Sequence, residues 1–113
     1  MLEQSQQPYI LIVDDTSHNF VSFKAILKEW SQYLIFATSA KEALRQVLIY
    51  DFAVILLDVQ MPDMNGFEAA KLIRAREKSS YTPIIFLSAF NQNELDINQG
   101  YALGAVDYIL KPI

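Results

Sequence analysis

Two uninterrupted apolar runs, each closed by aspartate, constrain this 113-residue chain more than any other feature. Tyr9–Val13 leads into Asp14 and Asp15, and Phe52–Leu57 leads into Asp58. Runs rich in β-branched and large aliphatic residues, with no polar alternation, are typical of strands buried on both faces of a parallel sheet. Parallel strands end at the same edge, where open α/β sheets bind ligands. We therefore expect these carboxylates to meet at one edge of a sheet.

Each aspartate also has a structural alternative to a binding role. An aspartate after a strand is most often a helix N-cap or a turn residue, and Asp14 or Asp15 suits the cap of the helix expected next. Capping does not require two adjacent acids, and it does not explain Asp58 at the end of another strand. Two carboxylates ~4 Å apart repel by about 4 kcal/mol at an effective dielectric of ~20. The trio therefore indicates a bound cation or a carboxylate with a chemical use.

Helical and strand patterns alternate along the rest of the chain. Apolar periodicity predicts helices over about 17–30, 40–48, 67–78 and 94–103, and further strands over 34–37, 84–87 and 107–110. Ser39 to Glu42 has the spacing of a capping box, and Asn65-Gly66 suits a turn with positive φ. This alternation predicts a doubly wound α/β fold, with helices on both faces of a five-stranded parallel sheet.

Composition excludes several classes of protein. A chain of 113 residues, 52% of them hydrophobic, suits one domain with one core. A net charge of −4 and scattered basic residues argue against binding to nucleic acid phosphates. There is no cysteine, no apolar stretch of membrane-spanning length and no signal-peptide layout. We expect a cytoplasmic protein without a nucleic acid or membrane partner.

The later strand ends also carry polar residues. Ser88 closes the fourth strand, and Lys111 follows the fifth. Carboxylate oxygens suit Mg²⁺, while a hydroxyl and an ammonium group suit the oxygens of a phosphoryl group. His18 is the only histidine, and we expect it to be exposed at the start of a helix. No glycine is followed by the Lys-Ser or Lys-Thr of a P-loop.

Five motifs in order resemble the receiver domain of two-component response regulators and hybrid histidine kinases. They are Asp14-Asp15, Asn19, Asp58 with Met61–Gly66, Thr82–Ala89 and Gly104–Pro112. The resemblance implies the flavodoxin-like strand order 2-1-3-4-5, with the final helix missing from this chain. It also implies an N-terminal arm over residues 1–8 and a receiver domain over 9–113, which we expect to be part of a longer protein.

The resemblance implies a role for each acid. Asp58 would be the phosphoacceptor, which attacks a phosphohistidine on a partner kinase. Asp15 and Asp58 would hold Mg²⁺ directly and Asp14 largely through water, while Gln60 would contribute its backbone carbonyl.

Three residues at the other strands complete the implied site. Ser88 would bond a phosphoryl oxygen, and Lys111 would pair with the phosphoryl charge. Tyr108 would be the aromatic switch whose burial follows Ser88. The Lys111-Pro112 bond would be cis, so that the turn aims the lysine at the site.

The implied function is that of a phosphoacceptor in a two-component phosphorelay. A histidine kinase or phosphotransfer domain would supply the phosphoryl group, and the domain would catalyse its own phosphorylation and dephosphorylation. Its switched surface would control an output module, expected in the same polypeptide. Gln60 and Phe90 depart from the family pattern and flank the path of the hydrolytic water, so they bear on the lifetime of the phosphorylated state.

Three alternatives belong to other classes. A hydrolase of the haloacid dehalogenase-like family needs a second acid two residues after its nucleophile, where this chain has Gln60. A flavodoxin-like nucleotide-binding module would place phosphate after the first strand, where Asp14 and Asp15 repel it. A pseudo-receiver would bind a partner without being phosphorylated.

The missing final helix predicts an exposed apolar face. Right-handed crossovers place the first helix on one face of the sheet and the next three on the other. Outward-facing residues of the third to fifth strands would then lack cover, and we expect self-association through them. They are drawn from Ile55, Leu57, Ile85, Leu87 and Ile109.

Overall fold

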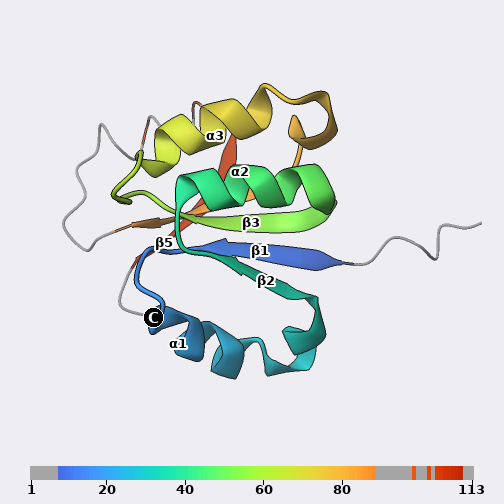
Figure 1. Cartoon of the computed structure of the whole chain (residues 1–113), viewed down its shortest axis with the longest axis vertical. Helices are drawn as coiled ribbons and strands as arrows, with labels where there is room; N and C mark the ends of the chain where they lie inside the picture. The colour runs from blue at the N-terminus through green and yellow to red at the C-terminus, as the bar shows by residue number, and fades with distance from the viewer. Residues whose placement is uncertain (1–7, 89–97, 99–101, 103, 111–113) are drawn as a thin grey trace, which may run out of the picture.

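The strands form one parallel sheet (Figure 1). The structure is a computed structural model, and it describes residues 8–88, 98, 102 and 104–110. The sheet order is β2-β1-β3-β4-β5, and every pairing is parallel. The strands are β1 (Tyr9–Val13), β2 (Leu34–Ala37), β3 (Phe52–Asp58), β4 (Ile84–Ser88) and β5 (Ala105–Leu110). The predicted parallel, flavodoxin-like sheet is confirmed.

Helices occupy the connections between strands. They are α1 (Asn19–Ile26), α2 (Ala40–Ile49) and α3 (Gly66–Arg74), with the 3₁₀ segments η2 (Lys28–Tyr33) and η3 (Glu77–Ser79). None of these described helices is both long and apolar enough to span a bilayer.

Two helix predictions were too long. The predicted helix over 17–30 divides at Leu27, whose φ of −107° and ψ of 32° leave α-helical geometry, and a 3₁₀ segment follows. The helix predicted to reach Lys78 ends at Arg74, because Arg76 adopts an extended conformation. The helix predicted over 94–103 lies almost wholly outside the described residues, of which Asn98 and Ala102 are helical.

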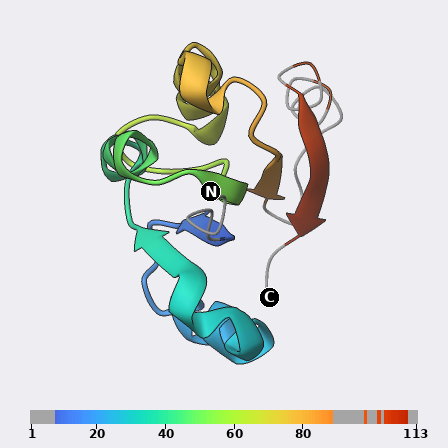
Figure 2. The same ribbon diagram turned by 90° about the vertical axis from the view of Figure 1, so that its right-hand side faces the viewer.

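Each face of the sheet packs against different helices. Figure 2 shows α2 and α3 on one side of the sheet and α1 on the other. The α2–α3 side holds the larger core, in which Ile55, Leu57 and Phe86 are fully buried. The α1 side holds a smaller cluster built on Ile12, Phe23, Leu56 and Leu87.

This division corrects the predicted uncovered face. Ile55 and Leu57 were assigned to it wrongly, because they point toward α2 and α3 and are fully buried. Leu87 does lie on the α1 side but is also fully buried. Ile85 and Ile109 lie on that side and are half-buried.

The junction between β3 and α3 depends on Asn65 and Gly66. Asn65 was expected in a turn with positive φ, but its φ is −77° and it is the N-cap of α3, in a capping box with Glu68. Gly66 serves a close approach instead, since a Cβ added there would lie 2.2 Å from the carbonyl oxygen of Asp58. The start of α3 is therefore packed directly on the end of β3. Among the described residues, only Gly104 has positive φ.

Candidate functional site

Three carboxylates converge at the carboxyl edge of the sheet. Asp14 follows β1, and Asp58 ends the neighbouring strand β3, which is parallel to β1. Asp14 and Asp58 are buried, at 0% and 1% exposure, whereas Asp15 is exposed. One carboxylate oxygen from each of the three lies within 4.8 Å of the others. The structure thus brings together the acids that were expected to meet.

The Asp14 carboxylate is held by the turn that follows it. Its Oδ1 accepts a hydrogen bond from the backbone N–H of Thr16 at 2.9 Å, and its Oδ2 accepts one from the side-chain Nδ2 of Asn19 at 3.0 Å. The N-cap position of α1 is occupied by the exposed His18, which makes no side-chain cap hydrogen bond. The capping role considered for Asp14 is therefore not what the structure shows. Asn19, at the start of α1, orients the acid.

The Asp58 carboxylate is fixed by the loop that leaves β3. Its Oδ1 accepts a hydrogen bond from the backbone N–H of Gln60 at 3.1 Å. The next residue, Val59, donates its N–H to the carbonyl of Leu87 in β4 at 3.0 Å. These bonds hold the end of β3 against its neighbour and fix the direction of the buried carboxylate.

Ser88 places a buried hydroxyl at the same edge of the sheet. It ends β4 and is 1% exposed, and its Oγ has no hydrogen-bond partner among the described residues. An unsatisfied buried hydroxyl costs about 1–3 kcal/mol, and such groups in native structures call for a ligand, ion or water. The hydroxyl is what a site for an oxygen-rich ligand needs.

The remaining predicted site residues are placed only in part. Tyr108 lies in β5, paired with Phe86 of β4, but its side chain is outside the described structure. Lys111, Pro112 and Phe90 are outside the described residues altogether. Gln60 is exposed in the loop directly after Asp58.

The acidic cluster fits a hard divalent cation. Mg²⁺ binds oxygen at about 2.1 Å in octahedral geometry, so its ligand oxygens are roughly 3–4 Å apart. Carboxylate oxygens within 4.8 Å of one another need only a small adjustment to reach that spacing. The donors are all oxygens, which is the set that Mg²⁺ prefers. Both the spacing and the chemistry of the cluster therefore suit Mg²⁺.

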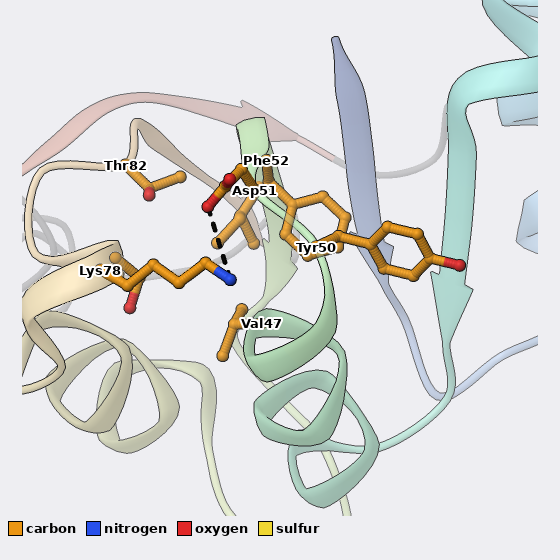
Figure 3. A pocket seen from close by; sticks show the side chains of 8 residues that line it. Val47, Tyr50, Asp51, Phe52, Lys78 and Thr82 are labelled. Atoms are coloured by element: carbon orange, nitrogen blue, oxygen red, sulfur yellow. Dashed lines mark ion pairs between the residues drawn. The ribbon is translucent and has the colours of Figure 1, made fainter. Parts of the chain in front are cut away.

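A cavity of about 70 Å³ lies at the opposite, amino-terminal edge of the sheet (Figure 3). Its apolar wall comes from Val47 and Phe52. Two other lining residues, Lys78 and Asp51, form an ion pair of 3.6 Å, with side chains 49% and 79% exposed. Exposed pairs of this kind contribute ~0–1 kcal/mol. The cavity shares no lining residue with the acidic cluster.

Comparison with known protein families identifies the kind of domain to which this acidic site belongs. Residues 10–113 match the response regulator receiver domain. The chain belongs to that family. The resemblance noted in the sequence is thereby confirmed, and we refer to the chain from here as the receiver domain.

Relatives and solved structures agree with this assignment. A "Probable cyclic di-GMP phosphodiesterase" of Vibrio cholerae is 36% identical over 112 residues, which cover 99% of this chain and 25% of that protein. Transcriptional regulatory protein YvrH of Bacillus subtilis is 43% identical over 104 residues, which cover 91% of this chain and 42% of YvrH. The structure of chemotaxis protein CheY4 of Vibrio cholerae is similar with a TM-score of 0.85 at 30% identity, covering 95% of this chain and 88% of that one.

The match covers only part of the curated relatives. The receiver domain spans 25% of the first relative and 42% of the second. The activities in their names, phosphodiesterase and transcriptional regulation, therefore belong to longer proteins.

One residue of the site was missed in the sequence. Asp63, in the loop between β3 and α3, accepts hydrogen bonds from the backbone N–H groups of Ala40 and Lys41 at the start of α2. No local pattern signals this contact, because its partners lie 22 and 23 residues earlier in the chain.

Proposed function

We propose that the receiver domain accepts a phosphoryl group on Asp58 from a phosphohistidine of a histidine kinase or phosphotransfer domain. The observation that carries this proposal is the buried Asp58 carboxylate, clustered with two other acids. The same edge holds the buried hydroxyl of Ser88, which has no hydrogen-bond partner in the described part of the chain. In a purely structural role, buried polar groups have hydrogen-bond partners. This edge instead combines a cluster of carboxylates with a buried hydroxyl that no described residue bonds.

The chain's own residues account for the transfer. A carboxylate oxygen of Asp58 forms a bond to phosphorus while the P–N bond of the phosphohistidine breaks, and the electron pair returns to the imidazole nitrogen. The Gln60 N–H donates a hydrogen bond to Oδ1 of Asp58 and thereby fixes the orientation of the attacking carboxylate. Such transfers depend on positioning and charge stabilisation rather than on an elaborate base.

The metal would be held by Asp15 and Asp58 directly, by Asp14 largely through water, and by the backbone carbonyl of Gln60. When bound, Mg²⁺ neutralises charge on the phosphoryl oxygens during transfer. Thr16 and Asn19 orient the Asp14 carboxylate for this role, so its two oxygens are positioned before the cation binds.

The other residues at the edge would bind and report the phosphoryl group. Ser88 would donate its hydroxyl to a phosphoryl oxygen, and Lys111 would pair with the added charge. Movement of Ser88 toward the phosphoryl group would open space for Tyr108, which would change the surface read by an output module in a longer protein. A second copy of the domain is also a proposed partner, through the half-covered face that includes Ile85 and Ile109.

The experiment is phosphorylation of the purified domain with acetyl phosphate and Mg²⁺. We expect one phosphoryl group by intact mass, and borohydride trapping should locate it at Asp58. Asp58→Asn should abolish the label. Asp51→Asn is the matched control, because it makes the same change at an exposed aspartate far from the edge, and it should label normally.

Two results would overturn the proposal. Label at another residue, or label that persists in Asp58→Asn, would contradict the assigned acceptor. Failure of the wild-type domain to be labelled by acetyl phosphate, or by a histidine kinase, would favour the pseudo-receiver.

A further inference from the structure

The loop between β3 and α3 bonds to a helix that precedes both elements. Figure 1 shows this loop beside the amino-terminal end of α2. Oδ1 of Asp63 accepts a hydrogen bond from Ala40 N–H at 3.2 Å, and Oδ2 accepts one from Lys41 N–H at 2.9 Å. Both oxygens of one loop carboxylate are therefore bound to the backbone of one helix end.

These two bonds complete the amino-terminal end of α2. The first N–H groups of a helix have no partner within the helix. Ser39 Oγ accepts the N–H of Glu42 at 3.1 Å, and Ser39 O accepts that of Ala43 at 3.0 Å. Ser39 does not bind the N–H groups of Ala40 and Lys41, and these are the two that donate to Asp63. The helix end is thus shared between its own cap and the loop.

The same loop begins at the acidic cluster and is fixed there at both of its ends. Gln60 donates its N–H to Oδ1 of Asp58 at 3.1 Å, and Gly66 donates its N–H to the carbonyl of Val59 at 2.7 Å. Between these points Gln60 and Asp63 are exposed. Met61 and Met64 contact the core only as half-buried, flexible side chains. Asp63 supplies the directional bonds in the middle of the loop.

Electrostatics favours the charged form of Asp63. Desolvation raises the pKa of this carboxyl, but backbone N–H donors, foremost those of Lys41 and Ala40, lower it by more, and the net pKa lies below the ordinary value. An anion at a helix N-terminus is also stabilised by the helix dipole. The anchor is therefore formed at neutral pH.

We propose that Asp63 is a positioning residue for the phosphoryl-accepting site. By fixing the loop against α2, it holds Gln60 so that its N–H binds Asp58 and its carbonyl faces the proposed metal position. This inference rests on the proposed function, since the carbonyl of Gln60 matters only if the site binds a cation. A helix cap alone would stabilise α2 and leave the site unchanged.

Two substitutions separate these roles. Asp63→Ala removes both bonds between the loop and α2. Ser39→Ala is the matched control, because it removes a capping bond from the same helix end and leaves the Asp63 carboxylate in place. Asp63→Asn retains one carbonyl oxygen, which can accept one of the two N–H bonds, and should restore part of the effect.

Two readouts are measured on the whole domain. The first is Mg²⁺ affinity by calorimetry. We expect Asp63→Ala to weaken Mg²⁺ affinity roughly 10-fold, as is typical for the loss of a residue that orients a metal ligand. The affinity of Asp63→Asn should lie between those of Asp63→Ala and wild type. Ser39→Ala should bind Mg²⁺ as tightly as wild type. The second needs no metal: amide hydrogen exchange at Gln60 should be faster in Asp63→Ala than in Ser39→Ala.

The outcomes are distinguishable. Equal Mg²⁺ affinity and equal Gln60 exchange in Asp63→Ala and Ser39→Ala would overturn the positioning role. A wild-type domain that binds no Mg²⁺ would contradict the proposed function. In that case, faster amide exchange at Gln60 in Asp63→Ala than in Ser39→Ala would still show that Asp63 holds the loop, and equal rates would show that it does not.

Discussion

Asp14 and Asp58 are two carboxylates buried side by side, and each has donors that make its burial tolerable. The Asp14 carboxylate accepts hydrogen bonds from Thr16 and Asn19, and the Asp58 carboxylate accepts a hydrogen bond from the backbone N–H of Gln60. Hydrogen bonds lower the cost of burying a charge, but they do not remove the repulsion between neighbouring anions. Asp58 is therefore held in a position that suits chemistry more than stability.

We expect Asp58→Asn to raise the melting temperature of the domain without Mg²⁺. The amide removes one of three clustered charges and keeps an oxygen that can accept the Gln60 N–H. A gain of about 1 kcal/mol would correspond to ~4–8 °C. Calorimetry would measure it, with Asp51→Asn as the control at an exposed aspartate. Mg²⁺ should stabilise the wild type by mass action and have less effect on Asp58→Asn. Identical melting curves in all these conditions would contradict a strained cluster.

The acidic residues could be predicted from the sequence, whereas their supports could not. Asp14 and Asp58 were identifiable because parallel strands end at a common edge, so strand ends alone determine that they meet. The bond from Asp63 to α2 depends on the distance between a loop and a helix from separate βα units, which no local pattern encodes. The buried Ser88 hydroxyl, for which the described residues offer no hydrogen-bond partner, likewise becomes apparent only once the neighbouring strands are in place.

At the scale of elements, helix lengths were harder to predict than strand positions. The apolar spacing continues from α1 through Leu27 to Trp30, although the chain changes to a 3₁₀ segment. Both helix types place residues three apart on the same side, so an apolar pattern cannot distinguish them. The strands β1 and β2 have the predicted bounds, because short apolar runs end where polar residues begin.

The hydrogen bonds between the Asp63 carboxylate and the start of α2 should weaken at low pH. The pKa of Asp63 is lower in the folded state, so its contribution to stability is present above its unfolded pKa and is lost as pH falls through the folded one. We expect wild type to exceed Asp63→Asn in unfolding free energy by about 0.3–1 kcal/mol near pH 7, and the difference to shrink below about pH 4. Urea unfolding at a series of pH values would measure it. A difference that is as large at pH 3 as at pH 7 would contradict a charged anchor.

At the scale of the whole molecule, the described helices cover the two faces of the sheet unevenly. Figure 2 shows α1 next to β2 and β1, at the border of the sheet that is away from β5. Ring contacts agree, since Phe20 of α1 packs on Phe36 of β2 at 4.4 Å between centroids. Toward β5, the α1 side carries the half-buried Val54, Ile85 and Ile109.

We expect this 113-residue chain to self-associate at micromolar concentration through that side. Sedimentation velocity should show a concentration-dependent shift toward a dimer, and Ile85→Lys should abolish it by placing a charge on the half-buried patch. Val21→Lys is the control, because Val21 is 68% exposed on α1 and is a site of the same side-chain type away from β5. A wild-type chain that sediments as a monomer at all concentrations would contradict the expectation.

The arginine at the end of α3 links that helix to the segments that lead into two strands of the sheet. The Arg74 guanidinium donates to the carbonyls of Ser79, Ser80 and Thr82, ahead of β4, and to that of Gly104, just before β5. The other end of α3 is seated on the backbone of Asp58 through Gly66. A helix of nine residues, about 13 Å long, is thus clamped at both ends. Through these contacts one helix joins the end of β3 to the backbone that leads into β4 and β5.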